Sequence, residues 1–138
     1  MKKILLLDDN FEIVLMLRTI VGELGYAVRS ATDGKSALAL LQRESIDLII
    51  SDLRMPGMDG WEFIKRARED GYTGHVLILT AFPQMAEATR LRSLGVHRLL
   101  MKPIQIARFE EQLHELLDET PEDPASAAGP ESPSTSQL

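Results

Sequence analysis

Two kinds of feature are missing from this chain of 138 residues: it has no cysteine, and it has no apolar run near the ~20 residues that a membrane-spanning helix requires. The lack of cysteine excludes disulfides, thiolate metal sites and cysteine nucleophiles. Only four apolar residues separate Met1-Lys2-Lys3 from the first two acids, which is too few for a signal-peptide core. We therefore expect a cytoplasmic protein without membrane contact.

An excess of positive charge is also missing. The formal net charge is −6, and residues 119–138 hold four acids but no Lys or Arg. Without that segment the net charge is only −2. Such a balance gives no electrostatic support for binding nucleic acid, and we expect no direct contact with it.

The pattern of apolar residues predicts an α/β fold. Five short apolar runs alternate with five amphipathic segments, and there is no internal repeat. The expected strands are residues 3–8, 26–31, 46–52, 75–81 and 96–101. This alternation favours a five-stranded parallel sheet with right-handed crossovers and with helices on both faces.

Capping residues mark where the helices are expected to begin. Asp9 or Asn10 caps the first helix, and Glu12 is spaced to form a capping-box-like pair with Asp9. Pro83 and Pro103 are suited to the first turns of the fourth and fifth helices.

The composition changes at Glu119. Residues 119–138 are rich in Pro, Glu, Ser, Ala and Thr and contain no apolar cluster. Burial in such a segment cannot offset its ordering entropy. We expect one folded domain over residues 1–118, followed by a disordered tail or linker.

Polar residues follow four of the expected strands. Asp8 ends the first and Asp9 follows it, Asp52 ends the third, Thr80 lies next to the end of the fourth, and Lys102 follows the fifth. Because the carboxyl ends of parallel strands meet at one edge of the sheet, we expect three carboxylates, a hydroxyl and an ammonium to share one crevice.

These charges point to a particular chemistry. Two like charges about 4 Å apart cost on the order of 4 kcal/mol at an effective dielectric constant near 20. Lys102 cannot neutralise three carboxylates, so either one is protonated or a cation such as Mg²⁺ joins them. A carboxylate can accept a phosphoryl group, and that transfer depends on positioning and on neutralising charge. We expect transient phosphorylation of an aspartate.

At these positions the sequence resembles the receiver domain of two-component response regulators. The resemblance spans about Lys2 to Asp118. It is carried by the acidic pair Asp8-Asp9, by Asp52 with Met55-Pro56-Gly57-Met58-Asp59-Gly60, by Thr80-Ala81 and by Lys102-Pro103. It implies a flavodoxin-like strand order, 2-1-3-4-5.

The resemblance also implies a separate role for each acid. Asp52 would be phosphorylated by a histidine kinase or a phosphotransfer protein. Asp9, Asp52 and the main-chain carbonyl of Arg54 would hold Mg²⁺ directly, and Asp8 would act mainly through water.

Further implied roles concern the other strand ends. Lys102 would pair with the phosphoryl group, Thr80 would move toward it as a switch, and the Lys102–Pro103 bond would be cis. Leu99 stands where the family commonly has Tyr or Phe, so we expect Thr80 to move but the output surface to differ.

Two more residues occupy positions that tune hydrolysis of the aspartyl phosphate in the family. These are Arg54, two residues after Asp52, and Phe82, two residues after Thr80. We expect the bulky Phe82 to screen the phosphorus from water and to lengthen the life of the phosphorylated form.

The implied function is phosphorelay signalling by a phosphoacceptor, not an enzyme acting on a separate substrate. The sequence shows no output domain, so we expect a downstream protein contact, from a monomer or a weak homodimer. Residues 88–109 contain five cations and no acid. Two interpretations of this stretch stay open: a solvated basic face, or a surface that meets an acidic partner.

Three alternatives remain. Phosphohydrolases with an Asp nucleophile carry Asp-x-Asp after their first strand, whereas this chain has Asp8-Asp9-Asn10. A binding module could keep the fold without being phosphorylated. A flavodoxin is disfavoured because no Ser/Thr/Gly-rich loop follows the first strand. The histidines His75, His97 and His114 lack metal-ligand spacing and are expected to be structural or exposed.

Overall fold

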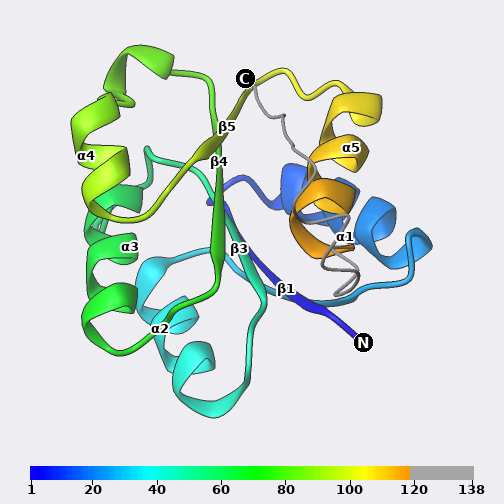
Figure 1. Cartoon of the computed structure of the whole chain (residues 1–138), viewed down its shortest axis with the longest axis horizontal. Coiled ribbons are helices and arrows are strands. Elements are labelled where there is room, and N and C mark those ends of the chain that lie inside the picture. The colour runs from blue at the N-terminus through cyan, green and yellow to red at the C-terminus, as the bar shows by residue number, and fades with distance from the viewer. Residues whose placement is uncertain (119–138) are drawn as a thin grey trace, which may run out of the picture.

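The computed structural model describes residues 1–118, which form a five-stranded parallel sheet in the order β2-β1-β3-β4-β5 (Figure 1). The strands are β1 (Lys3–Leu7), β2 (Ala27–Ala31), β3 (Leu48–Ser51), β4 (His75–Thr80) and β5 (Arg98–Met101). The helices are α1 (Phe11–Glu23), α2 (Gly34–Arg43), α3 (Gly60–Glu69), α4 (Ala88–Ser93) and α5 (Ile106–Leu117), with a 3₁₀ turn, η1 (Pro83–Met85). The predicted fold class and strand order are confirmed.

The sheet separates two apolar layers. Along β1, Leu5 and Leu7 belong to one buried cluster, and Ile4 and Leu6 belong to the other. This alternation follows from the period of two along a strand. Helices α2, α3 and α4 cover the first face, and α1 and α5 cover the second (Figure 1). Helices therefore lie on both faces, as predicted.

The register of the strands determines where the polar residues at their carboxyl ends lie relative to one another. Leu7 lies beside Ser51 in the β1–β3 pair, so the residues that follow them, Asp8 and Asp52, leave the sheet side by side. Thr80 lies beside Met101 in the β4–β5 pair, immediately before Lys102. Parallel pairing thus brings residues from four separate segments to one edge.

Some expected boundaries are wrong. Asn10 caps α1, accepting hydrogen bonds from the backbone N–H groups of Glu12 and Ile13, so the capping-box pair of Asp9 with Glu12 does not form. Pro83 begins the short η1 turn, and α4 starts only at Ala88. Helix α5 starts at Ile106, because the first intrahelical bond runs to the carbonyl of Gln105 rather than to one near the proline.

The prediction of a disordered tail or linker concerns residues 119–138, which lie outside the described residues, so the domain boundary at Asp118 stays a prediction. None of the helices found within residues 1–118 has the length and apolar character needed to cross a membrane.

Candidate functional site

An open cleft of about 880 Å³ lies at the carboxyl edge of the sheet. Its lining includes Asp8, Asp9, Asp52, Lys102 and the two loop residues Arg54 and Phe82. The sequence predicted that these strand ends would meet, and the structure brings them together.

Three carboxylates gather in this cleft. One oxygen from each of Asp8, Asp9 and Asp52 lies within 4.8 Å of the others. Asp8 is only 4% exposed and Asp52 only 7%, whereas Asp9 is exposed. The side chain of Asp9 makes no hydrogen bond to any residue in the range 1–118. The acids therefore differ in solvation although they are neighbours.

The Lys102 ammonium joins the two buried acids. Its Nζ lies 2.7 Å from Asp8 Oδ2 and 2.9 Å from Asp52 Oδ2. Burial alone lowers the pKa of Lys102, but the hydrogen bonds to Asp8 and Asp52 outweigh it and hold the pKa above its usual value. Burial raises the pKa of Asp8, and the bonds from Lys102 and Asn10 offset this only in part. Lys102 is therefore charged at neutral pH.

The other oxygen of Asp52 is fixed by the backbone. The N–H of Leu53 donates to Asp52 Oδ1 at 2.7 Å, and the N–H of Arg54 donates to the same oxygen at 3.3 Å. The first residue of α3, Gly60, packs so closely that a Cβ there would lie 2.1 Å from the Asp52 carbonyl oxygen. Only glycine fits this approach, which holds the main chain of Asp52 against α3.

Thr80 is fully buried beside the cleft. Its Oγ1 accepts a hydrogen bond from the N–H of Phe82 at 2.9 Å, and its carbonyl accepts one from the N–H of Lys102 at 2.8 Å. The hydroxyl is thereby linked to the β4–α4 loop, and the main chain is linked to β5.

A cation–π contact closes one side of the cleft. The Arg54 guanidinium carbon lies 4.6 Å from the centre of the Phe82 ring, which joins the loops after β3 and β4. The sequence indicated a role for each residue separately but did not predict their contact, because this contact depends on side-chain rotamers in two loops. Leu99 does not line the cleft, and the Lys102–Pro103 bond is cis.

The donor set fits Mg²⁺. This ion prefers oxygen ligands at about 2.1 Å in an octahedron, so two directly bound oxygens lie at most about 4.2 Å apart. The oxygens of the three carboxylates, one from each, lie within 4.8 Å of one another. They would have to move only slightly closer to bind one ion directly, or one of them would bind it through a water molecule. The exposed carboxylate of Asp9 keeps the site open toward solvent.

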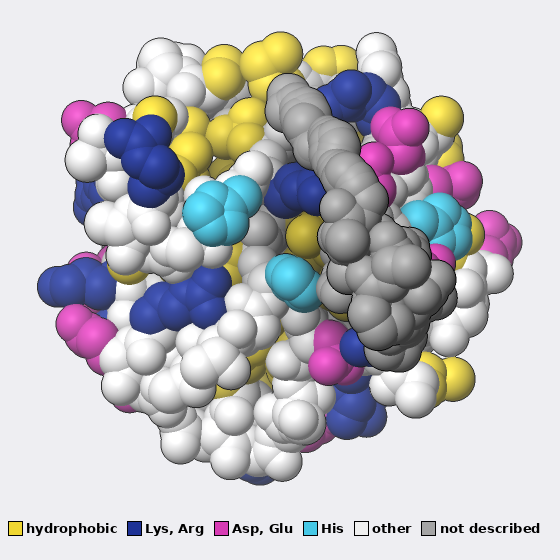
Figure 2. Space-filling model, viewed as in Figure 1, with side chains coloured by type: hydrophobic (Ala, Val, Ile, Leu, Met, Phe, Trp, Pro, Cys, Tyr) yellow, Lys and Arg dark blue, Asp and Glu magenta, His cyan; other side chains and the backbone are white. Residues whose placement is uncertain are grey.

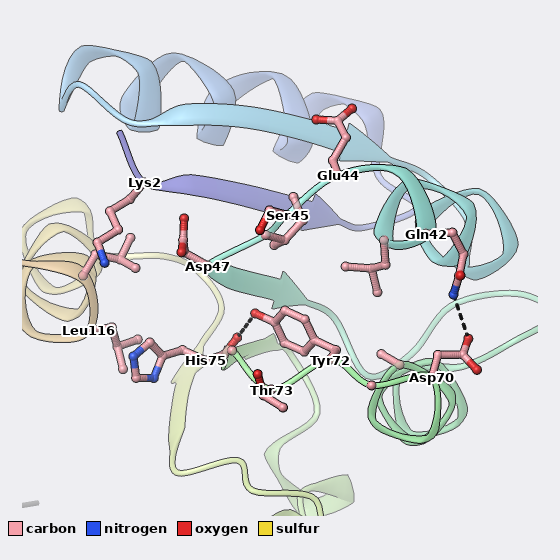
Figure 3. A pocket seen from close by; sticks show the side chains of 16 residues that line it. Lys2, Gln42, Glu44, Ser45, Asp47, Asp70, Tyr72, Thr73, His75 and Leu116 are labelled. Atoms are coloured by element: carbon pink, nitrogen blue, oxygen red, sulfur yellow. Dashed lines mark hydrogen bonds between the residues drawn. The ribbon is translucent and has the colours of Figure 1, made fainter.

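A second cavity, of about 670 Å³, lies at the opposite, amino edge of the sheet (Figure 3). Some of its polar groups bond to one another: the Tyr72 hydroxyl donates to the His75 carbonyl at 2.8 Å, and Gln42 Nε2 donates to Asp70 Oδ2 at 3.4 Å. The side chains of His75, His97 and His114 are all exposed, as expected. Sequence reasoning did not predict this cavity, because its lining comes from loops without a recognisable motif.

Comparison with known proteins identifies relatives along the whole fold. The profile of the response regulator receiver domain matches residues 4–114. The chain is 36% identical over 115 residues to the transcriptional regulatory protein TctD of Salmonella typhimurium, covering 83% of this chain and 51% of TctD. It is 30% identical over 116 residues to sporulation initiation phosphotransferase F of Bacillus subtilis, covering 84% and 94%. It is 35% identical over 137 residues to the virulence sensor protein BvgS of Bordetella pertussis, covering 91% of this chain but only 11% of BvgS.

Solved structures agree. Chemotaxis protein CheY4 of Vibrio cholerae matches with a TM-score of 0.78 and 33% identity, over 85% of this chain and 99% of CheY4. Response regulator TrrA of Thermotoga maritima, solved in complex with Mg²⁺–BeF, matches with a TM-score of 0.75 and 29% identity, over 85% and 100%. The matches thus span most of phosphotransferase F, about half of TctD and a small part of BvgS.

Proposed function

Because this chain belongs to the response regulator receiver domain family, we propose that it accepts a phosphoryl group on Asp52 and so transmits a signal in a two-component phosphorelay. One observation carries the assignment to Asp52. Its carboxylate lies 2.9 Å from Lys102 Nζ, beside two further acids and open to a cleft. The phosphoryl donor would be a histidine kinase or a histidine phosphotransfer protein, and the output would be a contact with a downstream protein.

The transfer would use the groups that surround Asp52. A carboxylate oxygen of Asp52 attacks the phosphorus, the bond from phosphorus to the donor's imidazole nitrogen breaks, and that nitrogen keeps the electron pair. Lys102 leaves Asp52 Oδ2 to pair with the incoming phosphoryl oxygens. When bound by Asp9, Asp52 and the Arg54 carbonyl, with Asp8 through water, Mg²⁺ supplies the remaining positive charge.

Thr80 would be the switch. Its hydroxyl accepts a hydrogen bond from the Phe82 N–H, and a movement toward a phosphoryl oxygen would lengthen this bond. That change would shift the β4–α4 loop and the Arg54–Phe82 contact with it. Leu99 has no ring to turn inward, so we propose that the change is carried by this loop rather than by an aromatic residue on β5.

Intact mass spectrometry after treatment with acetyl phosphate tests the assignment. We expect a gain of one phosphoryl group with Mg²⁺, no gain with EDTA, and no gain for Asp52→Asn under either condition. Asp70→Asn, at the amino edge, is the matched control and should react as the native chain does.

Two results would reject the proposal. A native chain that fails to gain mass would favour a binding module that keeps only the fold. Sustained release of phosphate from free phosphoesters would favour a phosphohydrolase.

A further inference from the structure

Among residues 1–118, strand β5 is an outer edge of the sheet and pairs only with β4. The N–H of Lys102 donates to the Thr80 carbonyl at 2.8 Å, so Lys102 faces β4. Backbone direction alternates along a strand, so Leu100 also faces β4, whereas Leu99 and Met101 direct their N–H and C=O groups outward. Within residues 1–118, no loop or side-chain group forms a hydrogen bond with these outward groups.

A groove of about 430 Å³ runs beside this free edge. Leu99, Met101 and Pro103 give it apolar walls, and Gln105 and Arg108 of the α5 side give it polar ones. Met101 is 58% exposed, an unusual state for a large apolar side chain on a strand. In Figure 1 β5 crosses the front of the molecule, with α4 on one side and α5 on the other.

The surroundings of the edge are positively charged. Residues 88–109 hold five cations and no acid. Arg90 stacks on Trp61, Arg98 pairs with Glu115, and Lys102 is used in the cleft. Arg92 and Arg108 are exposed and form no ion pair within residues 1–118. Figure 2 shows Lys and Arg side chains beside hydrophobic ones on this side of the molecule.

We propose that the β5 edge binds an extended segment of a partner protein as a sixth strand, and that this segment alternates apolar and acidic residues. The outward groups of Leu99 and Met101 would supply the backbone hydrogen bonds, as in other cases of strand addition. Apolar side chains of the partner would enter the groove, and its acids would meet Arg108. The outward groups are unbonded within residues 1–118 without any phosphoryl group, so this inference does not depend on the proposed phosphorylation.

Charge and composition favour a partner over the other possible occupants. A second copy pairing through the same edge would bring the basic stretch 88–109 against itself. Residues 119–138 of the same chain are acidic, but they contain four prolines, which cannot donate to a ladder.

Amide hydrogen exchange of the full ¹⁵N-labelled chain tests the proposal, with a short capped peptide of alternating valine and glutamate as the probe. Without peptide, we expect the amides of Leu99 and Met101 to exchange fast, and those of Leu100 and Lys102 to exchange slowly. Saturating peptide should slow exchange at Leu99 and Met101 by about tenfold or more, which is about 1.4 kcal/mol of added protection.

Two peptide controls distinguish strand addition from nonspecific binding. The same peptide methylated on the backbone nitrogens that would face β5 cannot donate, and it should not bind. A valine–lysine version should bind at least about tenfold more weakly, because it faces cations.

Chain variants complete the test. Arg108→Glu should weaken binding of the valine–glutamate peptide about tenfold, and Arg43→Glu on α2, a matched exposed arginine elsewhere, should not change it. Binding by the native chain should be the same in EDTA as with Mg²⁺ when no phosphoryl donor is present, so a failure of the phosphorylation proposal is scored separately.

Several outcomes would overturn the inference. These are absence of binding, binding without protection of Leu99 and Met101, and equal binding of the methylated peptide. Protection in the free chain would also overturn it: if it rises with concentration the occupant is a second copy, and if it does not the occupant is residues 119–138.

Discussion

The two edges of this sheet differ in how far their charges are balanced by ion pairs. At the carboxyl edge, the carboxylates of Asp8, Asp9 and Asp52 share a cleft with one ammonium, that of Lys102. At the amino edge, polar groups are matched: Glu44 lies 3.0 Å from Lys3 Nζ and 2.9 Å from Arg29 Nε.

The two edges also differ in how their backbone carbonyls are paired. At the amino edge, the Arg68 side chain donates to the carbonyls of Leu94, Tyr72, Gly74 and Gly95, which ties together the loops before β4 and β5. Apart from Lys102, no residue in the range 1–118 makes an ion pair with the acids of the carboxyl edge. One edge therefore stabilises the fold, and the other keeps an excess of negative charge that suits a cation.

The largest expected effect comes from removing the common cation of the carboxyl edge. Lys102→Met leaves Asp8 and Asp52 buried without it, and in EDTA we expect the free energy of unfolding to fall by about 3 kcal/mol. Urea denaturation measures this change. Mg²⁺ should restore part of the loss, and so should a second substitution, Asp52→Asn. An unchanged denaturation midpoint would show that the acids do not repel as argued.

At the amino edge, Arg68→Ala should lower the free energy of unfolding by about 2 kcal/mol, because carbonyls that are now paired lose a charged donor. Phosphorylation of Asp52 by acetyl phosphate should proceed at the native rate. Arg66→Ala, which removes only the exposed pair with Glu62, serves as the control and should leave stability unchanged. Slower phosphorylation in Arg68→Ala would mean that the two edges are not independent.

A smaller effect is expected where Phe82 borders the cleft. Phe82→Ala removes both the ring and its contact with Arg54, so water reaches the phosphorus more easily. We expect the phosphorylated form to decay about threefold faster, or about 0.7 kcal/mol in activation free energy. Loss of the phosphorylated mass with time gives the rate, with the exposed Phe11→Ala as control. Equal decay in all three proteins would rule out screening by Phe82.

The smallest effect concerns Tyr26, at the amino end of β2. Burial, together with a hydrogen bond of 2.8 Å to Asp118, raises the pKa of Tyr26 to about 12. Because this pKa is higher in the folded state, Tyr26 stabilises the fold fully below about pH 10 and loses that contribution as the pH rises toward 12. Asp118→Asn should move the pKa back toward 10 in an ultraviolet titration of phenolate.

The second tyrosine is the internal control for that titration. Burial raises the pKa of Tyr72 further, and its hydroxyl is bonded to the His75 carbonyl rather than to Asp118. Its titration should therefore be the same in both proteins. If Tyr26 titrates unchanged in Asp118→Asn, its pKa is set by burial alone.

The sequence was most informative where a strand ends in a polar residue. Asp52 and Lys102 could be placed together because parallel strands share one carboxyl edge, and strand order follows from the receiver-like motifs. The helix cap at Asn10, and not Asp9, could not be predicted, since both side chains suit that position and only the backbone geometry selects one. The free edge at Leu99 and Met101 likewise depends on which neighbours α4 and α5 leave uncovered.

The close approach of Gly60 to Asp52 has a consequence for motion. With no room for even a methyl group between the first residue of α3 and the Asp52 carbonyl, that helix cannot take a side chain at this point without being pushed outward. The loop after β4 is held instead by individual hydrogen bonds, such as the one that the Phe82 N–H donates to Thr80 Oγ1. The cleft is thus bordered by close backbone packing on one side and by a loop with fewer restraints on the other, so if Asp52 is phosphorylated as proposed, we expect the loop after β4 to respond first.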